Sequence, residues 1–157
     1  MGSVDLKKLL EGREFLSVAT SSLKGVPNAA PKFLLKVEGH KIWLVDYTIG
    51  QTWRNLRENN RTSISFMDFK MLVGYQLNGN VKIIEKGPKY DRMCKEMIDK
   101  EIRLTAQHII EDVRGHSKHE HFEIGITERF IILEVTINEI VQIGHRGEVV
   151  REKVRRA

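Results

Sequence analysis

The chain has 157 residues but only one cysteine, Cys94, and three prolines. A single cysteine excludes an internal disulfide and any metal site built from several cysteines, and it favours a reducing environment. No stretch approaches the roughly 20 apolar residues that a membrane span needs. The first residues also lack the apolar core of a secretory signal. We therefore expect a cytoplasmic protein with no membrane partner and no metal site.

The motifs of the common enzyme classes are missing as well. The sequence contains no Gly-x-Ser-x-Gly elbow, no His-Glu-x-x-His pair, no phosphate loop ending in Gly-Lys-Ser/Thr and no Gly-x-Gly-x-x-Gly. These absences disfavour a serine hydrolase and a dinucleotide-binding Rossmann site. No catalytic residue can be assigned, so the function must depend on a less common set of residues.

The charge is moderately positive and mixed. Twenty-six Lys and Arg residues stand against 21 Asp and Glu residues, which gives a net charge of +5. This balance suits an anionic ligand, but the basic residues are scattered, and only residues 151–156 form a local basic run. We expect a basic tail over 146–157 that is solvated or frayed, and no nucleic-acid partner, although a basic-tailed barrel that binds nucleic acid stays as an alternative.

Short apolar runs separated by turn residues predict an antiparallel barrel. Strands are expected over 15–20, 28–37, 42–46, 62–67, 71–83 and 130–137. Helices are expected over 3–11 with Ser3 as N-cap, over 49–60, and over a long stretch from 88 to about 115. The fold class is α+β, with about six strands, a short helix after the third strand and a longer helix before the last. All 157 residues are expected to form one domain.

Single positions refine this expectation. Gly39-His40 is a two-residue hairpin signal, and Gly79 marks a bulge or a close backbone approach. The apolar alternation changes parity after Asn138, which predicts a second irregularity there. Cys94 falls on the apolar stripe of the long helix and is interpreted as a buried, unreactive thiol.

The start of the helix at 49–60 could bind an anion. Its first amide groups and the Thr52 hydroxyl could face a phosphate, with Asn55 one turn along and several arginines nearby. The same residues are also ordinary caps and solvated charges. The residues alone leave both interpretations open.

Three segments together resemble a known family. Residues 46–66 are similar to the flavin-phosphate helix and following strand of the pyridoxamine-phosphate-oxidase-like FMN proteins, which are split barrels. Residues 26–33 resemble the family strand beside the flavin ring, and residues 74–84, followed by Gly87-Pro88, resemble its long strand and entry to the next helix. The likeness covers residues 13–90 and returns over 129–143.

The resemblance implies FMN as the cofactor and assigns roles by position. Residues beside the flavin ring would be Ala30, Pro31, Lys32 and Phe33, partly through backbone groups. Asp46 and Tyr47 would lie near the ribityl chain and the ring. Gln51 and Thr52 would hold the phosphate, with Asn55 in support. The chain departs from the family at Gln51, where many relatives carry Lys or Arg, and at Asn60, where Pro is frequent.

The resemblance also implies a function. It points to an FMN-binding flavoprotein, an oxidoreductase on an unknown small substrate with a nicotinamide reductant as an option, and a homodimer with the flavin at its interface. Strands 62–85 are candidates for that interface. No equivalent of the basic C-terminal signature of the true oxidase is found. Alternatives are a non-enzymatic FMN-binding or electron-carrier protein, and a split barrel that binds haem or a deazaflavin.

A histidine-rich stretch precedes the last strand. His116, His119 and His121 could serve as metal or haem ligands, or could face a substrate. Their spacing places them on neither one helical face nor one strand face. We interpret residues 115–128 as a polar, pH-sensitive loop.

Overall fold

The computed structural model describes residues 4–115 and 129–154, and its elements follow the predicted order as far as the sixth strand. The elements are α1 (Leu6–Leu9), β1 (Phe15–Ser21), β2 (Pro27–Glu38), β3 (Lys41–Asp46), α2 (Gln51–Glu58), β4 (Arg61–Asp68), β5 (Val73–Ile84), α3 (Pro88–Gly115), β6 (Ile131–Ile143) and β7 (Val149–Lys153).

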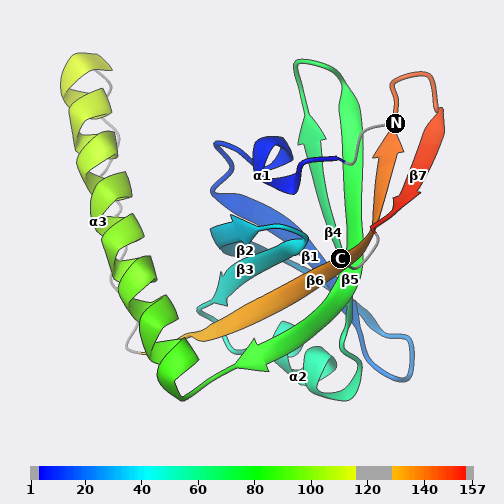
Figure 1. The fold of residues 1–157 in the computed structure, drawn as a ribbon, viewed down its shortest axis with the longest axis horizontal. Helices are drawn as coiled ribbons and strands as arrows, with labels where there is room; N and C mark the ends of the chain where they lie inside the picture. Colours follow the sequence, from blue (N-terminus) through cyan, green and yellow to red (C-terminus); the bar gives the residue numbers. More distant parts are fainter. Residues whose placement is uncertain (1–3, 116–128, 155–157) are drawn as a thin grey trace.

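Six of the strands close into an antiparallel barrel. The sheet order is β3-β2-β1-β4-β5-β6-β7, and an additional pairing of β3 with β6 joins the ends of the first six strands. β7 lies outside this ring and pairs with the second half of β6. Figure 1 shows α3 on one side of the barrel and β7 on the other. The α+β split-barrel prediction is confirmed.

Strand alternation fills the barrel with apolar side chains. Leu16, Val18, Ile64, Leu77 and Leu133 are almost fully buried, and each occupies an inward position of its strand. Burying one such side chain is worth about 1.5–3 kcal/mol, so this core dominates the stability of the barrel.

The strand irregularity predicted near Asn138 is present. Asn78 of β5 lies opposite Glu139, whereas Gly79 lies opposite Ile137, so Asn138 is the extra residue of a bulge. A Cβ atom on Gly79 would lie 2.2 Å from the Thr136 carbonyl oxygen. The close approach predicted at Gly79 is therefore confirmed, and it explains why glycine stands there.

The start of α1 differs from the prediction. Asp5 is the N-cap, and its Oδ1 accepts hydrogen bonds from the backbone N–H groups of Lys7 and Lys8 at 3.0 and 3.4 Å. Ser3 lies outside the described residues, and the helix covers one turn only. Aspartate is as good an N-cap as serine, and in the structure Asp5 begins the helix.

The C-terminal tail is not a frayed terminus throughout. Residues Val149–Lys153 form β7, paired in register with residues Glu139 to Ile143 of β6. Arg151 also contacts Glu139, with Nη1 3.3 Å from Oε2. Charged residues in this segment suggested solvation, but they are equally typical of an edge strand that is exposed on one side.

The long helix α3 covers a second apolar cluster. Met93 and Met97 pack with Phe33, Trp43 and Val45 on the outer side of β2 and β3. The apolar stripe predicted on this helix is buried at Met93 and Met97, whereas the four isoleucines from Ile98 to Ile110 are exposed. Cys94 is half-buried, and burial raises the pKa of its thiol, in line with an unreactive side chain.

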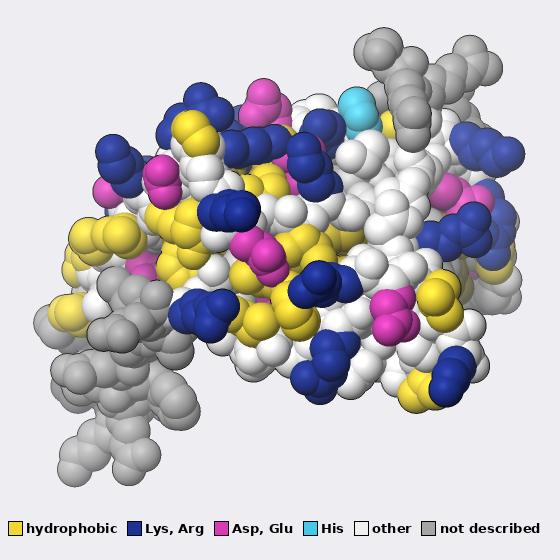
Figure 2. All heavy atoms as spheres, turned by 90° about the horizontal axis from the view of Figure 1, so that it is seen from below, with side chains coloured by type: hydrophobic (Ala, Val, Ile, Leu, Met, Phe, Trp, Pro, Cys, Tyr) yellow, Lys and Arg dark blue, Asp and Glu magenta, His cyan; other side chains and the backbone are white. Residues whose placement is uncertain are grey.

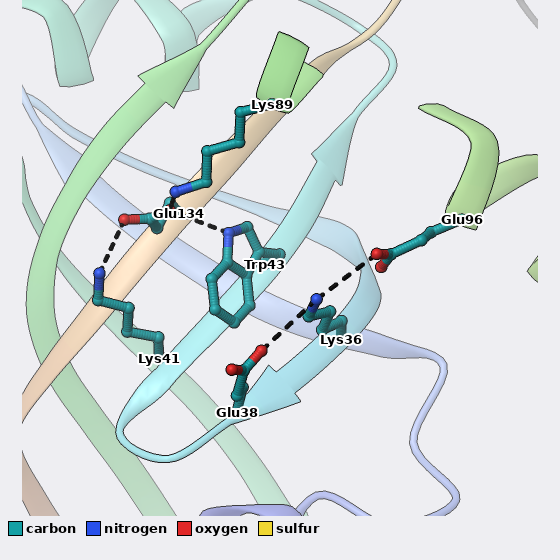
Figure 3. A network of polar contacts seen from close by, with 7 residues as sticks. All are labelled: Lys36, Glu38, Lys41, Trp43, Lys89, Glu96 and Glu134. Atoms are coloured by element: carbon teal, nitrogen blue, oxygen red, sulfur yellow. Dashed lines mark hydrogen bonds and ion pairs between the residues drawn. The ribbon is translucent and has the colours of Figure 1, made fainter. Parts of the chain in front are cut away.

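Glu134 anchors the base of α3 to the barrel (Figure 3). Its carboxylate accepts hydrogen bonds from Lys41 Nζ and Trp43 Nε1, each at 3.1 Å, and from Lys89 at the start of α3. Burial alone would raise the pKa of Glu134, but the hydrogen bonds from Lys89 and Lys41 outweigh it and hold the pKa below its ordinary value. The network fixes where α3 leaves the barrel.

Among the described helices, none combines the length and the apolar character required to cross a membrane.

Candidate cofactor site

The candidate site begins at an unpaired edge of β2. Along Pro27 to Phe33 this strand pairs with β1, whereas its pairing with β3 starts only at Phe33. Because β3 ends at Asp46, no strand among the described residues covers the other edge of residues 27–32. Such an edge offers backbone N–H and C=O groups to a partner. Three predicted residues, Ala30, Pro31 and Lys32, belong to this edge.

A buried ion pair lies beside the edge. Lys32 Nζ is 2.8 Å from Asp46 Oδ1, and the two side chains are 3% and 0% exposed. The backbone N–H and the hydroxyl of Thr48 also donate to Asp46 Oδ1, at 3.0 and 2.9 Å. Asp46 Oδ2 is buried and has no hydrogen-bond partner in the described part of the chain. An unsatisfied carboxylate oxygen costs about 1–3 kcal/mol or more, so the site favours an incoming donor.

The turn into α2 is strained and leaves the helix start uncapped. Ile49 has a φ angle of 43°, a left-handed conformation that a β-branched residue seldom adopts. Such strain costs on the order of 1–3 kcal/mol and is concentrated at functional sites. Gly50 is the N-cap and provides no side-chain hydrogen bond. The first amide groups of α2 are therefore open to an anion.

Side chains of α2 are fixed by a hydrogen-bond network. Asn28 Nδ2 donates to Thr52 Oγ1 at 3.1 Å, and Gln51 Nε2 donates to Asn55 Oδ1 at 2.8 Å. Asn55 Nδ2 in turn donates to Thr20 Oγ1 at 3.1 Å. The structure thus brings the three predicted phosphate residues together. Asn28 and Thr20 were missed, although a polar Thr20 at an inward position of an apolar strand was a detectable signal.

The side chains of Tyr47 and Phe33, two residues predicted to lie near the flavin, point away from the other predicted residues. Tyr47 donates its hydroxyl hydrogen to Glu101 Oε1 of α3 at 2.8 Å, and burial together with this carboxylate raises the pKa of Tyr47. Phe33 is buried beneath α3, with Lys100 Nζ 5.1 Å from its ring centroid. Phe33 and Tyr47 therefore line the α3 side of β2 and β3, while Ala30, Lys32, Asp46 and the α2 residues gather on the other side.

Pro31 is exposed on the outer face of the sheet. The resemblance assigned nine residues to the flavin site: Ala30, Pro31, Lys32, Phe33, Asp46, Tyr47, Gln51, Thr52 and Asn55. The structure does not test whether any of these nine contacts a flavin, and the assignment stays a prediction. A groove of about 670 Å³ crosses the outer face near Thr20, Arg61 and Asn78, but none of the nine lines it.

On the face seen in Figure 2, Lys and Arg side chains are interspersed with acidic ones rather than gathered in one patch. The histidine-rich stretch lies outside the described residues, apart from Gly115 at the end of α3.

A closed antiparallel barrel, with a short helix starting beside an unpaired strand edge, defines the chain as a split barrel. The family model described as pyridoxamine 5'-phosphate oxidase matches residues 5–139, which is most of the chain. The chain belongs to this family. A comparison with curated proteins gave no match.

Solved structures show the same fold. One is a Clostridium acetobutylicum protein related to general stress protein 26 of B. subtilis, with 22% identity, a TM-score of 0.65, and coverage of 94% of this chain and 91% of that one. Another is HupZ of Group A Streptococcus, with 23% identity, a TM-score of 0.62, and coverage of 92% and 96%. Structures that share 10 to 16% identity include an FMN-binding protein of Nostoc punctiforme, an F420 reductase and a heme-binding protein of Mycobacterium smegmatis.

Proposed function

We propose that this chain binds FMN, with the phosphate at the start of α2 and the flavin along the unpaired edge of β2. The observation that carries the proposal is the uncapped start of α2 behind the strained Ile49. An anion there would satisfy free amide groups and interact favourably with the helix dipole. Gln51 and Thr52 would hold the phosphate, and Asn28 and Asn55 would keep these two side chains in place.

The buried Asp46 fits the middle of such a ligand. Its Oδ2 atom needs a hydrogen-bond donor, and the ribityl chain of FMN carries hydroxyl groups. Lys32 neutralises the carboxylate from the other side at 2.8 Å. Ala30, Pro31 and Lys32 would border the ring, and Phe33 would do so through its backbone, because its side chain is buried beneath α3.

The phosphate contact lacks the cation that many relatives have. Gln51 stands at that position, and Lys32 is engaged by Asp46 and Thr48. Arg54 donates a hydrogen bond from Nε to Gln51 Oε1 at 3.1 Å, so its guanidinium group brings a positive charge into contact with Gln51. Since charge-assisted hydrogen bonds are about twice as strong as neutral ones, we expect micromolar rather than nanomolar affinity.

The reaction we propose is oxidation or reduction of a small substrate, in a cytoplasmic homodimer with the flavin at its interface. Bound FMN would supply the hydride and electron transfer, while the residues of this chain bind and orient it. This division agrees with the missing motifs for acid–base and nucleophilic catalysis. A non-enzymatic electron carrier would use the same cofactor site. An oxidoreductase differs from such a carrier because it turns over a substrate in the steady state.

The test is a titration of FMN with purified protein, followed by the quenching of flavin fluorescence. We expect saturable micromolar binding to the wild type and weaker binding to Thr52→Ala and Asn55→Ala. NADH or NADPH is then added, because steady-state oxidation distinguishes an oxidoreductase from a carrier. No FMN binding to the wild type would sink the proposal, and parallel titrations with haem and a deazaflavin would show whether the site takes one of those ligands.

A further inference from the structure

A cleft of about 410 Å³ lies between α1, the second half of β2 and helix α3. Figure 1 shows α1 on the side of the barrel that faces α3. The floor of the cleft is apolar but deeply buried, since Leu10, Leu34 and Leu35 are each no more than 6% exposed. The accessible surface of the cleft therefore belongs mainly to the longer, charged side chains around it.

Positive charge exceeds negative charge around this cleft. Within the part of the chain that the structure describes, Lys36 alone of the lining cations forms ion pairs, with Nζ 3.5 Å from Glu38 Oε2 and from Glu96 Oε1 (Figure 3). Cations that gather without a bridging anion repel one another, so five cations against two carboxylates favour an anionic ligand. The cations are Lys7, Lys8, Arg13, Lys36 and Lys100, and the carboxylates are Asp5 and Glu11.

The ammonium group of Lys100 is half-buried at the α3 wall of the cleft. It donates to the backbone carbonyls of Leu34 and Leu35, at 2.5 and 3.1 Å, where the register between β2 and β3 shifts. Burial lowers the pKa of Lys100, because the ammonium group loses hydration and has no ion-pair partner among the described residues. An ammonium group has three N–H donors, so one donor is left for a ligand.

Arg13 is a second cation of the cleft that lacks a full set of partners. Its guanidinium stacks on the Phe66 ring, with Cζ 4.4 Å from the ring centroid. Its Nε atom is buried and has no hydrogen-bond acceptor in the described part of the chain. Since buried donors are nearly always paired in folded proteins, this group requires an acceptor from outside the described residues, such as an anion.

A neighbouring cleft on the other side of Lys100 lacks the surplus of positive charge. It has a volume of about 490 Å³ and shares Leu35 and Lys100 with the first cleft. Glu96 and Asp99 line it as well, and they balance the charges of Lys100 and Arg103. The unbalanced positive charge therefore lies on the α1 side of Lys100.

We propose that the cleft beside α1 binds a compact polyanion, a small molecule with two or more phosphate or carboxylate groups. One negative group would accept the remaining N–H donor of Lys100, and another would lie by Lys7 and Lys8 at the exposed rim. A ligand with a long apolar chain is disfavoured, because the leucines of the floor offer little surface. None of the nine residues of the flavin assignment lines this cleft, so the proposal does not depend on FMN.

Isothermal titration calorimetry with inorganic pyrophosphate and with citrate tests the proposal and distinguishes phosphate from carboxylate ligands. We expect the wild type to bind at least one of them with a dissociation constant on the order of 100 µM or lower at about 0.1 M salt. Lys100→Gln removes the charge but keeps an amide donor for the two carbonyls, and it should raise the dissociation constant about 10-fold. The double variant Lys7→Gln/Lys8→Gln should raise it about 3-fold or more.

Lys95→Gln is the matched control, because it removes one exposed positive charge from α3 at a position that does not line the cleft. Its dissociation constant should equal that of the wild type. Circular dichroism and thermal unfolding check that each variant is folded. Lys7 and Lys8 are exposed, so their double variant keeps the test decisive if Lys100→Gln loosens the contact between α3 and β2.

Thr52→Ala separates this cleft from the proposed phosphate site at α2, and it should leave the binding of both anions unchanged. Pyrophosphate or citrate binding by a protein that binds no FMN would uphold the cleft and refute the cofactor. A wild type that binds neither anion would overturn the proposal. So would binding that depends on Thr52 rather than on Lys100, or binding that Lys95→Gln weakens as much as Lys100→Gln does.

Discussion

Lys32 and Asp46 form an ion pair inside the barrel, with Nζ 2.8 Å from Oδ1 and both side chains buried. Two charges in this setting stabilise the fold only while they are together, because removing one leaves the other buried and unpaired. The pair also lies at the unpaired edge of β2, so it connects the stability of the barrel with the candidate cofactor site.

Breaking this pair should be costly. Lys32→Met or Asp46→Leu should each lower the free energy of unfolding by about 3–5 kcal/mol, since each leaves one unpaired buried charge. The double variant should lose less than the sum of the two single changes. Urea denaturation of the four proteins measures this coupling. Additive losses would show that the two side chains do not act as a pair.

Asn55 should support both the fold and the cofactor. Its side chain is 1% exposed and bonds to Thr20 and Gln51. Asn55→Ala should lower the free energy of unfolding by about 1–3 kcal/mol because it leaves buried groups without partners. It should also weaken FMN binding, as Gln51 loses its support. The exposed Asn60 provides the control, and Asn60→Ala should leave both quantities nearly unchanged.

Glu134 predicts a pH dependence of stability. Its pKa in the folded protein lies below the ordinary value of 4.5, so its contribution is fully present above about pH 4.5. The contribution is lost as the pH falls through the lower pKa of the folded state. Denaturation curves between pH 6 and pH 3 should therefore show a steeper loss for the wild type than for Glu134→Gln. Equal slopes would mean that the lysines do not stabilise the charged carboxylate.

Two glycines of β5 should respond differently to alanine. A Cβ atom at Gly79 would meet the Thr136 carbonyl oxygen at 2.2 Å, whereas one at Gly74 would have its nearest neighbour at 3.7 Å. Gly79→Ala must therefore shift the backbone at the bulge and should cost about 1–3 kcal/mol. Gly74→Ala should be nearly neutral. Thermal unfolding of both variants compares them directly, and a neutral Gly79→Ala would contradict the close approach.

The sequence was sufficient for the order of elements as far as β6 because alternation and turn residues are local signals. The hairpin at Gly39 and the bulge at Asn138 followed from the same signals. β7 was missed because Arg151, Glu152 and Lys153 resemble a solvated tail, and only the pairing with β6 makes them a strand. Long-range pairing is not encoded in local composition.

The site was predictable in part. The resemblance placed Gln51, Thr52 and Asn55 at one helix start, and the structure brings them together. It gave no sign that Lys32 would pair with Asp46 or that Tyr47 would turn toward Glu101. Both contacts depend on which side of a strand each residue faces. The Tyr47 contact also depends on the position of α3, whose start is held by the contact of Lys89 with Glu134, 45 residues away in the chain.

The most direct test of the cofactor site compares the affinities of FMN and riboflavin for the wild type, Thr52→Val and Thr62→Val. Thr62 is also buried, but its hydroxyl donates to the Ala19 carbonyl in the sheet, so it is a matched control. A phosphate at the start of α2 predicts that the wild type and Thr62→Val bind FMN roughly 10-fold or more tightly than riboflavin. It also predicts that Thr52→Val reduces this preference. Equal affinity of the wild type for the two flavins would contradict a phosphate site at α2.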